Sequence, residues 1–299
     1  MLPSITGVFP VFQTPFREDF SIDSEVLAAE IEWMYGHDID GIVMAMVSEV
    51  IRLSGEERRE LARLSCEYGL DHGPVVISVG AESTSIAVGF AHHAEEVGAT
   101  AVMAIPPMSV SAGEDELYRY YQALLDAIDI PVIIQDASGY VGEPMSIGMQ
   151  AGLLDAYQER VLFKPEAIPI GPRLTELRDA TEGGARVFEG SGGISLVDSF
   201  KRGIAGTMPG AEVCWAIVKL WNALKDGDDV RVNSINGPLA SLISLQTSFD
   251  AFVAVEKHLL VKQGVFTSAR VRGPVGFRLD PETTAEVDRV FELLVTASA

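Results

Sequence analysis

The chain has 299 residues, of which 47% are hydrophobic and 22% charged, a composition that can bury the core of one large domain. Its apolar runs are only as long as strands, which excludes a membrane span, and its start, MLPSITGVF, lacks the features of a signal peptide. A formal net charge of −21 argues against nucleic acid or an anionic membrane as a partner, and suits a cytoplasm of high salt content. We therefore expect a cytoplasmic protein whose two cysteines, Cys66 and Cys214, are buried and reduced.

A short apolar run followed by an amphipathic helical stretch recurs eight times along the chain. The predicted strands are residues 7–13, 41–47, 74–79, 101–105, 130–135, 161–164, 186–189 and 203–208. Strands that are apolar almost throughout indicate a parallel sheet covered by helices. Eight such units predict an α/β fold, a (β/α)8 TIM barrel, and a doubly wound open sheet is the alternative.

The helical stretches carry recognisable start signals. The helix after the second strand opens with Ser54-Gly55-Glu56-Glu57, a capping box in which Ser54 and Glu57 satisfy free backbone N–H groups. Pro172 suits the first residue of the helix after the sixth strand. Strand patterns stop near Ala211, and residues 211–263 and 281–297 are predicted helices. We expect residues 1–210 to form the barrel, and residues 211–299 a helical region that packs on it or forms an oligomer interface.

The active site of a TIM barrel lies at the carboxyl ends of its strands, which turns the predicted strands into a set of candidate residues. These candidates are Thr14, Ser48, Glu49, Ser109, Gln135, Asp136, Lys164, Glu166, Glu189, Ser191 and Met208.

Lys164 differs from the other five lysines, which all follow it and which, Lys257 included, lie in helical or surface-like stretches. It ends the apolar strand, where an ammonium group is costly unless it is paired or deprotonated. Desolvation favours the neutral amine, a nucleophile that can form a Schiff base with a 2-oxo acid. The alternative is a structural ion pair, for instance with Glu49 or Glu166.

Other kinds of site have weaker signals. The five histidines do not converge, which argues against a catalytic zinc, and neither a Gly-x-Gly-x-x-Gly nor a P-loop pattern occurs. The run from Glu189 to Gly193 follows the seventh strand, where barrels often bind phosphate, although its glycines could equally serve a tight turn. We expect no metal and no other cofactor, and a structural clamp in the run from Arg270 to Pro274.

Several segments together resemble one known family over nearly the whole chain. They are Gln13-Thr14-Pro15-Phe16, Ser48-Glu49 with the helix start after it, Pro106-Pro107, Phe163-Lys164-Pro165-Glu166-Ala167 and the run from Gly203 to Gly210. The chain resembles the dihydrodipicolinate synthase/N-acetylneuraminate lyase family, the pyruvate-type class I aldolases. The resemblance implies a TIM barrel, a Schiff base on Lys164, a small-molecule 2-oxo acid as the ligand, and a homo-oligomer, either a dimer or a tetramer.

This chain departs from the family pattern at its remaining site positions. The two adjacent hydroxyl residues that bind the substrate carboxylate are replaced by Met46 and Val47, which would make the pocket more apolar. The acid/base tyrosine is replaced by Gln135, which cannot transfer a proton near neutral pH. The relay tyrosine is replaced by Ser109 or a neighbour, and the arginine of the synthase branch aligns with Tyr140. These losses disfavour the synthase reaction.

Another residue must therefore move the proton. Asp136, Glu49 and Glu166 are the carboxylates in reach by this alignment, and a water held by Gln135 and Ser138 is a further route. We assign catalysis to Lys164, Gln135 and Asp136. We assign substrate binding to Thr14, Ser48, Glu49, Ser138, Glu166, Gly190 and Met208.

Three functions are compatible with these residues. The first is an aldolase or retro-aldolase that acts on a 2-oxo acid through Lys164. The second is a dehydratase of a 2-keto-3-deoxy sugar acid that uses the same Schiff base. The third is a barrel that binds a 2-oxo acid without turnover. The retained lysine favours the two enzymes, and the lost tyrosines favour the third reading.

Overall fold

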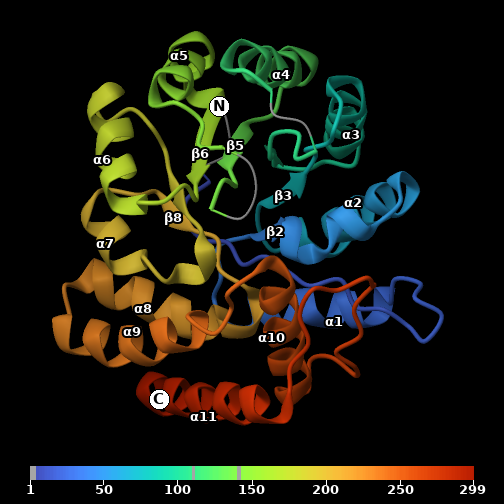
Figure 1. Cartoon of the computed structure of the whole chain (residues 1–299), viewed down its shortest axis with the longest axis vertical. Coiled ribbons are helices and arrows are strands. Elements are labelled where there is room, and N and C mark those ends of the chain that lie inside the picture. The colour runs from blue at the N-terminus through green and yellow to red at the C-terminus, as the bar shows by residue number, and fades with distance from the viewer. Residues whose placement is uncertain (1–4, 110–111, 140–142) are drawn as a thin grey trace.

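The computed structural model describes residues 5–109, 112–139 and 143–299, in which strands alternate with helices up to residue 213 (Figure 1). The strands are β1 (Gly7–Val8), β2 (Ile42–Met44), β3 (Val75–Ser78), β4 (Ala101–Ala104), β5 (Val132–Asp136), β6 (Val161–Pro165), β7 (Phe188–Glu189) and β8 (Gly206–Thr207). The helices between them are α1 (Ser24–Tyr35), α2 (Gly55–Gly69), α3 (Thr84–Glu96), α4 (Glu114–Ala127), α5 (Ile147–Tyr157), α6 (Ile170–Ala180) and α7 (Leu196–Lys201).

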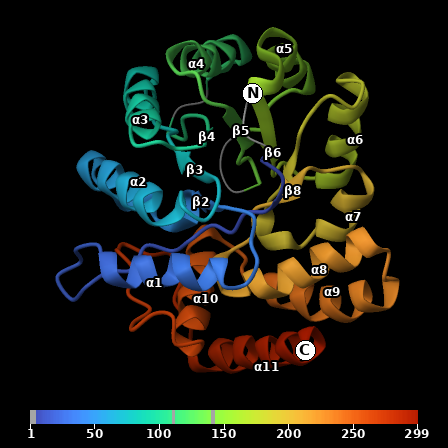
Figure 2. The same cartoon turned by 180° about the vertical axis from the view of Figure 1, so that it is seen from behind.

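Short 3-10 turns and four further helices complete the described chain. The turns are η1 (Met46–Ser48), η2 (Val50–Arg52), η3 (Gln158–Arg160), η4 (Ser191–Gly193) and η5 (Ala211–Val213). The further helices are α8 (Cys214–Asp226), α9 (Asp229–Ile243), α10 (Phe249–Lys262) and α11 (Pro281–Ser298). They lie together on one side of the molecule in the front and back views (Figures 1 and 2).

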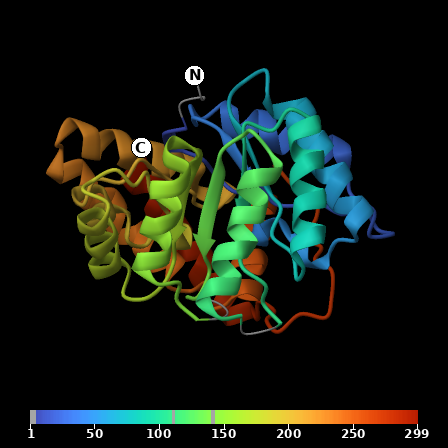
Figure 3. The ribbon, with the colours of Figure 1, turned by 90° about the horizontal axis from the view of Figure 1, so that it is seen from above.

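The strands close into a barrel. Strands β2 to β6 pair in chain order, β1, β8 and β7 form a second run, and every pair is parallel. Single parallel bridges join the two runs, from Val11 to Val43 at one seam and from Phe163 to Val187 at the other. Helices α4 and α5 cover the outside of the strands (Figure 3). The predicted (β/α)8 barrel is confirmed, and the open sheet is excluded because β1 pairs with β8.

Each predicted strand overlaps an observed one, and the largest difference is at the first. There, residues 7–13 were expected and the regular strand is Gly7–Val8, because Pro10 has no N–H to donate to a ladder. The capping box is confirmed: Ser54 accepts a bond from the Glu57 N–H, and the Glu57 side chain accepts one from the Ser54 N–H. Pro172 is the third residue of α6, not the first, but still lies in the turn whose N–H groups lack helical partners.

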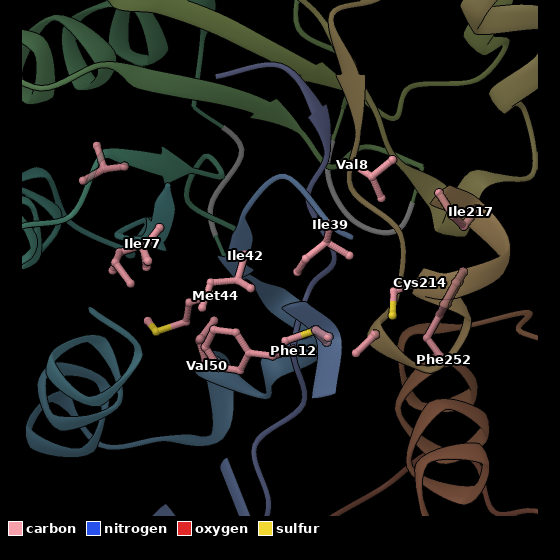
Figure 4. Close-up of a cluster of buried hydrophobic side chains, with 14 of the residues drawn as sticks. Val8, Phe12, Ile39, Ile42, Met44, Val50, Ile77, Cys214, Ile217 and Phe252 are labelled. Atoms are coloured by element: carbon pink, nitrogen blue, oxygen red, sulfur yellow. The ribbon is translucent and has the colours of Figure 1, made fainter. Parts of the chain in front are cut away.

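Two apolar clusters fill the interior. The inner one lies inside the barrel and includes Phe9, Val76, Met103, Leu162 and Met208. The outer one lies between strands and helices and continues into the last third of the chain. Figure 4 shows Cys214, Ile217 and Phe252 beside barrel residues of that cluster. The division of the chain at residue 210 stays a prediction.

Helix α10 is fixed to the barrel mouth by a buried lysine. Lys257 is fully buried, and its ammonium pairs with Glu49 and donates to the carbonyls of Thr14 (2.7 Å) and Arg270 (2.8 Å). Lys257 lies in a helical stretch, as expected, but its side chain is buried, because a carboxylate and two carbonyls replace the water around it. Glu49 therefore neutralises Lys257 and does not pair with Lys164.

The two cysteines and the run from Arg270 to Pro274 have the roles that the sequence indicates. Cys66 and Cys214 are buried free thiols, as predicted, and burial raises the pKa of Cys66 to about 12. Arg272 pairs with Glu57 and lies 4.6 Å over the Phe16 ring, so the run from Arg270 to Pro274 does clamp the chain to the barrel. Among the described residues, no helix is both long and apolar enough to cross a membrane.

Candidate active site

Lys164 lies near the carboxyl end of β6, where its Cα pairs with that of Gln135 on β5. Its side chain is 5% exposed, and the Nζ atom donates to Oε1 of Glu166 at 3.2 Å. The parallel barrel places this end of every strand at one mouth. The lysine is therefore held in an apolar setting beside the carboxylate of Glu166, and it lines the cavity described below.

Glu166 is held by three donors. Oε1 accepts hydrogen bonds from Lys164 and from the Ser191 N–H (3.0 Å), and Oε2 accepts one from the Gln135 amide (2.6 Å). Both oxygens are thus occupied, which fixes the carboxylate beside Lys164. Gly190 is required for this arrangement, since a Cβ there would lie 2.5 Å from Glu166 Oε1. The sequence left Glu49 and Glu166 open as ion-pair partners of Lys164, and the structure pairs this lysine with Glu166.

A cavity of about 470 Å³, including its opening, lies at this mouth of the barrel. Most of its wall is apolar, and Met46 and Val47 belong to it, as the departures from the family pattern predict. The other apolar side chains in the wall are those of Val11, Ala45, Met208, Pro209, Phe249 and Phe252. The polar side chains are Gln135, Lys164, Glu166, Ser191 and Glu256. Four predicted residues of the assigned set, Gln135, Lys164, Glu166 and Met208, are therefore brought together.

The other assigned residues lie outside this cavity wall, as far as the described chain shows. Thr14 donates to the Ser48 carbonyl and Ser48 to the Phe12 carbonyl, both at 2.6 Å, so their hydroxyls join the segment after β1 to η1. Glu49 neutralises Lys257. Gly190 gives Glu166 room.

Asp136 and Ser138 organise the chain after β5. Asp136 accepts from the N–H (3.1 Å) and hydroxyl (2.5 Å) of Ser138 and from the Met145 N–H (3.0 Å), and Arg173 lies 3.6 Å away. These contacts describe a loop anchor, and the catalytic role assigned to Asp136 stays a prediction. Ser109 is exposed and binds Glu82, and Tyr140 lies outside the described residues.

The loop after β7 is a tight turn. The Ser191 N–H already binds Glu166, and Ser191, Gly192 and Gly193 all have positive φ. Glu189 is 1% exposed and accepts from the Thr207 hydroxyl at 2.7 Å, and burial raises its pKa to about 8. The sequence left two roles open for this glycine-rich run, phosphate binding and a tight turn. The contacts agree with the tight turn. Among the residues described, no three His, Cys, Asp or Glu side chains are grouped so that they could hold a metal ion.

Glu256 of α10 is a cavity residue that sequence reasoning missed. It is 1% exposed and accepts a hydrogen bond from the Gln13 side-chain amide. Burial raises its pKa well above the usual value, and the nearby carboxyls of Glu212 and Glu30 act in the same direction. The signal for it was a glutamate in the apolar face formed by Phe252, Leu259 and Leu260, which lies far in the sequence from every predicted strand end.

Three comparisons place the chain among known proteins. It is 27% identical to L-2-keto-3-deoxyarabonate dehydratase from Azospirillum brasilense, over 95% of this chain and 93% of that protein. It is 29% identical to 4-hydroxy-tetrahydrodipicolinate synthase from Rhodospirillum centenum, over 79% and 81%. The fold matches the crystal structure of YagE, a prophage protein from E. coli K12 in complex with pyruvate, with a TM-score of 0.88, 23% identity and coverage of 98% and 99%.

The family model for the dihydrodipicolinate synthetase family matches residues 4–292, which is nearly the whole chain. This agrees with the motifs, with the closed barrel and with the position of Lys164 at its mouth. The chain belongs to the dihydrodipicolinate synthetase family.

Proposed function

We propose that this protein is a lyase that forms a Schiff base between Lys164 and C2 of a 2-oxo acid, and makes or breaks a bond next to that carbon. One observation carries the proposal: among the described residues, Lys164 is the one lysine in the cavity wall, and it is paired with a carboxylate that can accept its proton. Membership of a family with relatives named as L-2-keto-3-deoxyarabonate dehydratase and as 4-hydroxy-tetrahydrodipicolinate synthase supports it.

The first steps follow from the contacts of Glu166. It takes a proton from Lys164, and the neutral amine then attacks C2 of the oxo acid. Loss of water from the adduct leaves an iminium group, which withdraws electrons from C3. Gln135 holds Glu166 in place, and its side chain also reaches the cavity wall, where it can hydrogen-bond the substrate.

The cavity wall favours a substrate without a second carboxylate. Lys164 is its one cationic side chain in the part of the chain described, and Glu166 and Glu256 are both acidic. A second carboxylate would therefore find no second cationic partner in this wall. A neighbouring hollow shares Glu166, Ser191 and Phe252 with the cavity and has room for a longer, uncharged tail. This supports a reaction other than that of the synthase branch.

We infer aldol cleavage or formation as the first candidate reaction. Dehydration of a 2-keto-3-deoxy sugar acid is the second, and the similarity to a dehydratase over 95% of this chain favours it. Both start from the same Schiff base. We also propose that the protein is cytoplasmic and acts as a homo-oligomer, a dimer or a tetramer, and sedimentation of the purified protein would test the oligomeric state.

Borohydride reduction in the presence of pyruvate, followed by intact mass, tests the Schiff base. We expect a stable adduct in the wild type and in Lys225→Ala, which removes an exposed lysine of α8, and none in Lys164→Ala. A panel of larger 2-oxo acids then ranks substrates by the extent of trapping. If folded wild-type protein forms no adduct with any of these acids, a barrel that binds a 2-oxo acid without turnover is the better interpretation.

A further inference from the structure

The proposed lyase needs a group that removes and returns a proton at C3 or at the C4 hydroxyl, and the cavity offers few. Its titratable side chains within the described residues are Lys164, Glu166 and Glu256. Lys164 supplies the amine, and both oxygens of Glu166 are already occupied by hydrogen bonds from Lys164, the Ser191 N–H and Gln135. Gln135 does not transfer protons near neutral pH. Glu256 is the remaining side chain with suitable chemistry.

The contacts of Glu256 leave one oxygen for the cavity. Oε2 accepts a hydrogen bond from the Gln13 amide, whereas Oε1 makes no hydrogen bond with the part of the chain described. Gln13 is fixed in turn, because its backbone N–H donates to Glu30 at 2.9 Å. The carboxyl group is thus oriented by one donor and keeps a free oxygen beside the cavity that also holds Lys164.

Glu212 supplies a second carboxyl group at the same place. A Cβ at Gly210 would lie 2.2 Å from Glu212 Oε2 and 2.7 Å from Glu256 Oε1, so both oxygens flank this glycine. Glu212 Oε2 is buried and without a hydrogen-bond partner in the described chain, and Oε1 accepts from Gln246 at 3.4 Å. Two adjacent buried carboxyl groups cannot both ionise readily, so the pair favours holding one proton that either group can carry.

We propose that Glu256, in a proton-sharing pair with Glu212, is the acid/base residue of this site and exchanges protons with the substrate bound to Lys164. The inference rests on the proposed Schiff-base function. In this pair Glu212 is a positioning residue, since it lies outside the cavity wall and acts through Glu256.

The steps balance for both candidate reactions. In cleavage, the ionised Glu256 takes the C4 hydroxyl proton, the C3–C4 bond breaks, and its electrons form the enamine while an aldehyde leaves. The same carboxyl group then returns the proton to C3. In dehydration, Glu256 removes a C3 proton, the C4 hydroxyl leaves with a proton from the pair, and water is the product.

The assay measures this proton transfer without knowledge of the natural substrate. Pyruvate in D2O exchanges its C3 hydrogens for deuterium whenever the enamine forms and is reprotonated, and proton NMR follows the loss of the methyl signal. We expect Glu256→Gln to trap pyruvate with borohydride as the wild type does, while its exchange rate falls at least about 100-fold. Glu256→Asp, which keeps the acid, recovers part of the rate.

Glu189→Gln is the matched control. Glu189 is equally buried but outside the cavity wall, and its pKa of about 8 leaves it mostly protonated at pH 7, so the amide changes little charge. This variant keeps both trapping and exchange. Exchange at the wild-type rate in Glu256→Gln overturns the proposal, as does wild-type protein that traps pyruvate without exchange. A wild type that does not trap pyruvate contradicts the Schiff base itself, which is a different result.

A second measurement holds even if Glu256→Gln does not fold. The charged groups that face Glu256 are Glu30 from α1, Glu212 from η5 and Lys164 from β6. Removal of a C3 proton needs ionised Glu256, so the exchange rate rises with pH through the pKa of that group. Glu212→Gln removes a neighbouring negative charge, lowers this pKa and moves the rise to lower pH. An unchanged pH profile in this variant overturns the proposal.

Discussion

The side-chain amide of Gln13 donates to Glu256, a residue 243 positions later in the chain. This bond joins the end of the first barrel segment to α10, and so brings a helix from outside the eight repeats into the active site. Cavity residues therefore come from β5 and β6, from the segments that follow β1, β2, β6, β7 and β8, and from α10, which also supplies Phe249 and Phe252 to the wall. The consequences can be tested one residue at a time.

Glu166→Gln should slow Schiff-base formation. The amide cannot take the proton of Lys164, so the amine becomes nucleophilic less often. We expect the initial rate of pyruvate trapping to fall about 100-fold, within the usual contribution of general base catalysis. Rapid quenching with borohydride, followed by intact mass, measures this rate. An initial rate equal to that of the wild type would show that Lys164 loses its proton by another route.

Gly190→Ala should disturb the same carboxylate by steric contact alone. The added Cβ would lie 2.5 Å from Glu166 Oε1, so Glu166 must move away from Lys164. We expect trapping of pyruvate to fall at least about tenfold, since small displacements of catalytic groups are costly. Gly113→Ala is the control, because a Cβ there meets no atom within 4 Å. Equal trapping by the two variants would contradict the required approach at Gly190.

Lys257→Met should destabilise the fold. It leaves Glu49 as a buried carboxylate without its counter-ion, and the loss of one partner from such a pair costs about 3–5 kcal/mol. Urea denaturation measures the change in the free energy of unfolding. The double variant Lys257→Met with Glu49→Gln should recover part of the loss, because it removes the unpaired charge. Strict additivity of the two single effects would argue against a coupled pair.

Stability should depend on pH through Glu189. Its pKa in the folded protein is about 8, raised by burial from the usual 4.5. Between these values the folded state holds a proton that the unfolded state has released, so this group lowers stability as pH rises, by about 1.4 kcal/mol per pH unit. Below 4.5 and above 8 its contribution no longer changes.

Unfolding of the wild type and of Glu189→Gln at pH 5, 6 and 7 tests this dependence. The variant has no titrating group at position 189, so its free energy of unfolding should fall less steeply over that interval. The difference between the two slopes, and not the absolute stability, is the measured quantity. Parallel curves would mean that Glu189 is ionised in the folded protein.

The barrel and Lys164 were predictable because both rest on local patterns. Apolar runs of strand length alternate with helical stretches, and a lysine that ends such a run lies at the barrel mouth. Local patterns did not show which of the other strand-end candidates line the cavity. Successive side chains of a strand point to opposite faces, so Gln135 reaches the cavity and Asp136 the surrounding loop.

Glu256 could not be predicted from its neighbours, because its position depends on how α10 is placed over the barrel. That placement comes from long-range contacts, such as those of Lys257 with Glu49 and the Thr14 carbonyl. Helical periodicity identifies the buried face of α10 but not the cavity beneath it. The buried state of Lys257 escaped prediction for the same reason, since its counter-ion lies in a distant segment.

The position of α10 has a consequence for synthesis on the ribosome. Strand β6 and its reactive amine are made first, whereas Glu256, Phe249 and Phe252, which complete the cavity, are made only after α9. A nascent chain that already carries Lys164 lacks part of the wall that would shield a Schiff-base intermediate. Competence for the full reaction therefore requires that α10 has docked on the barrel.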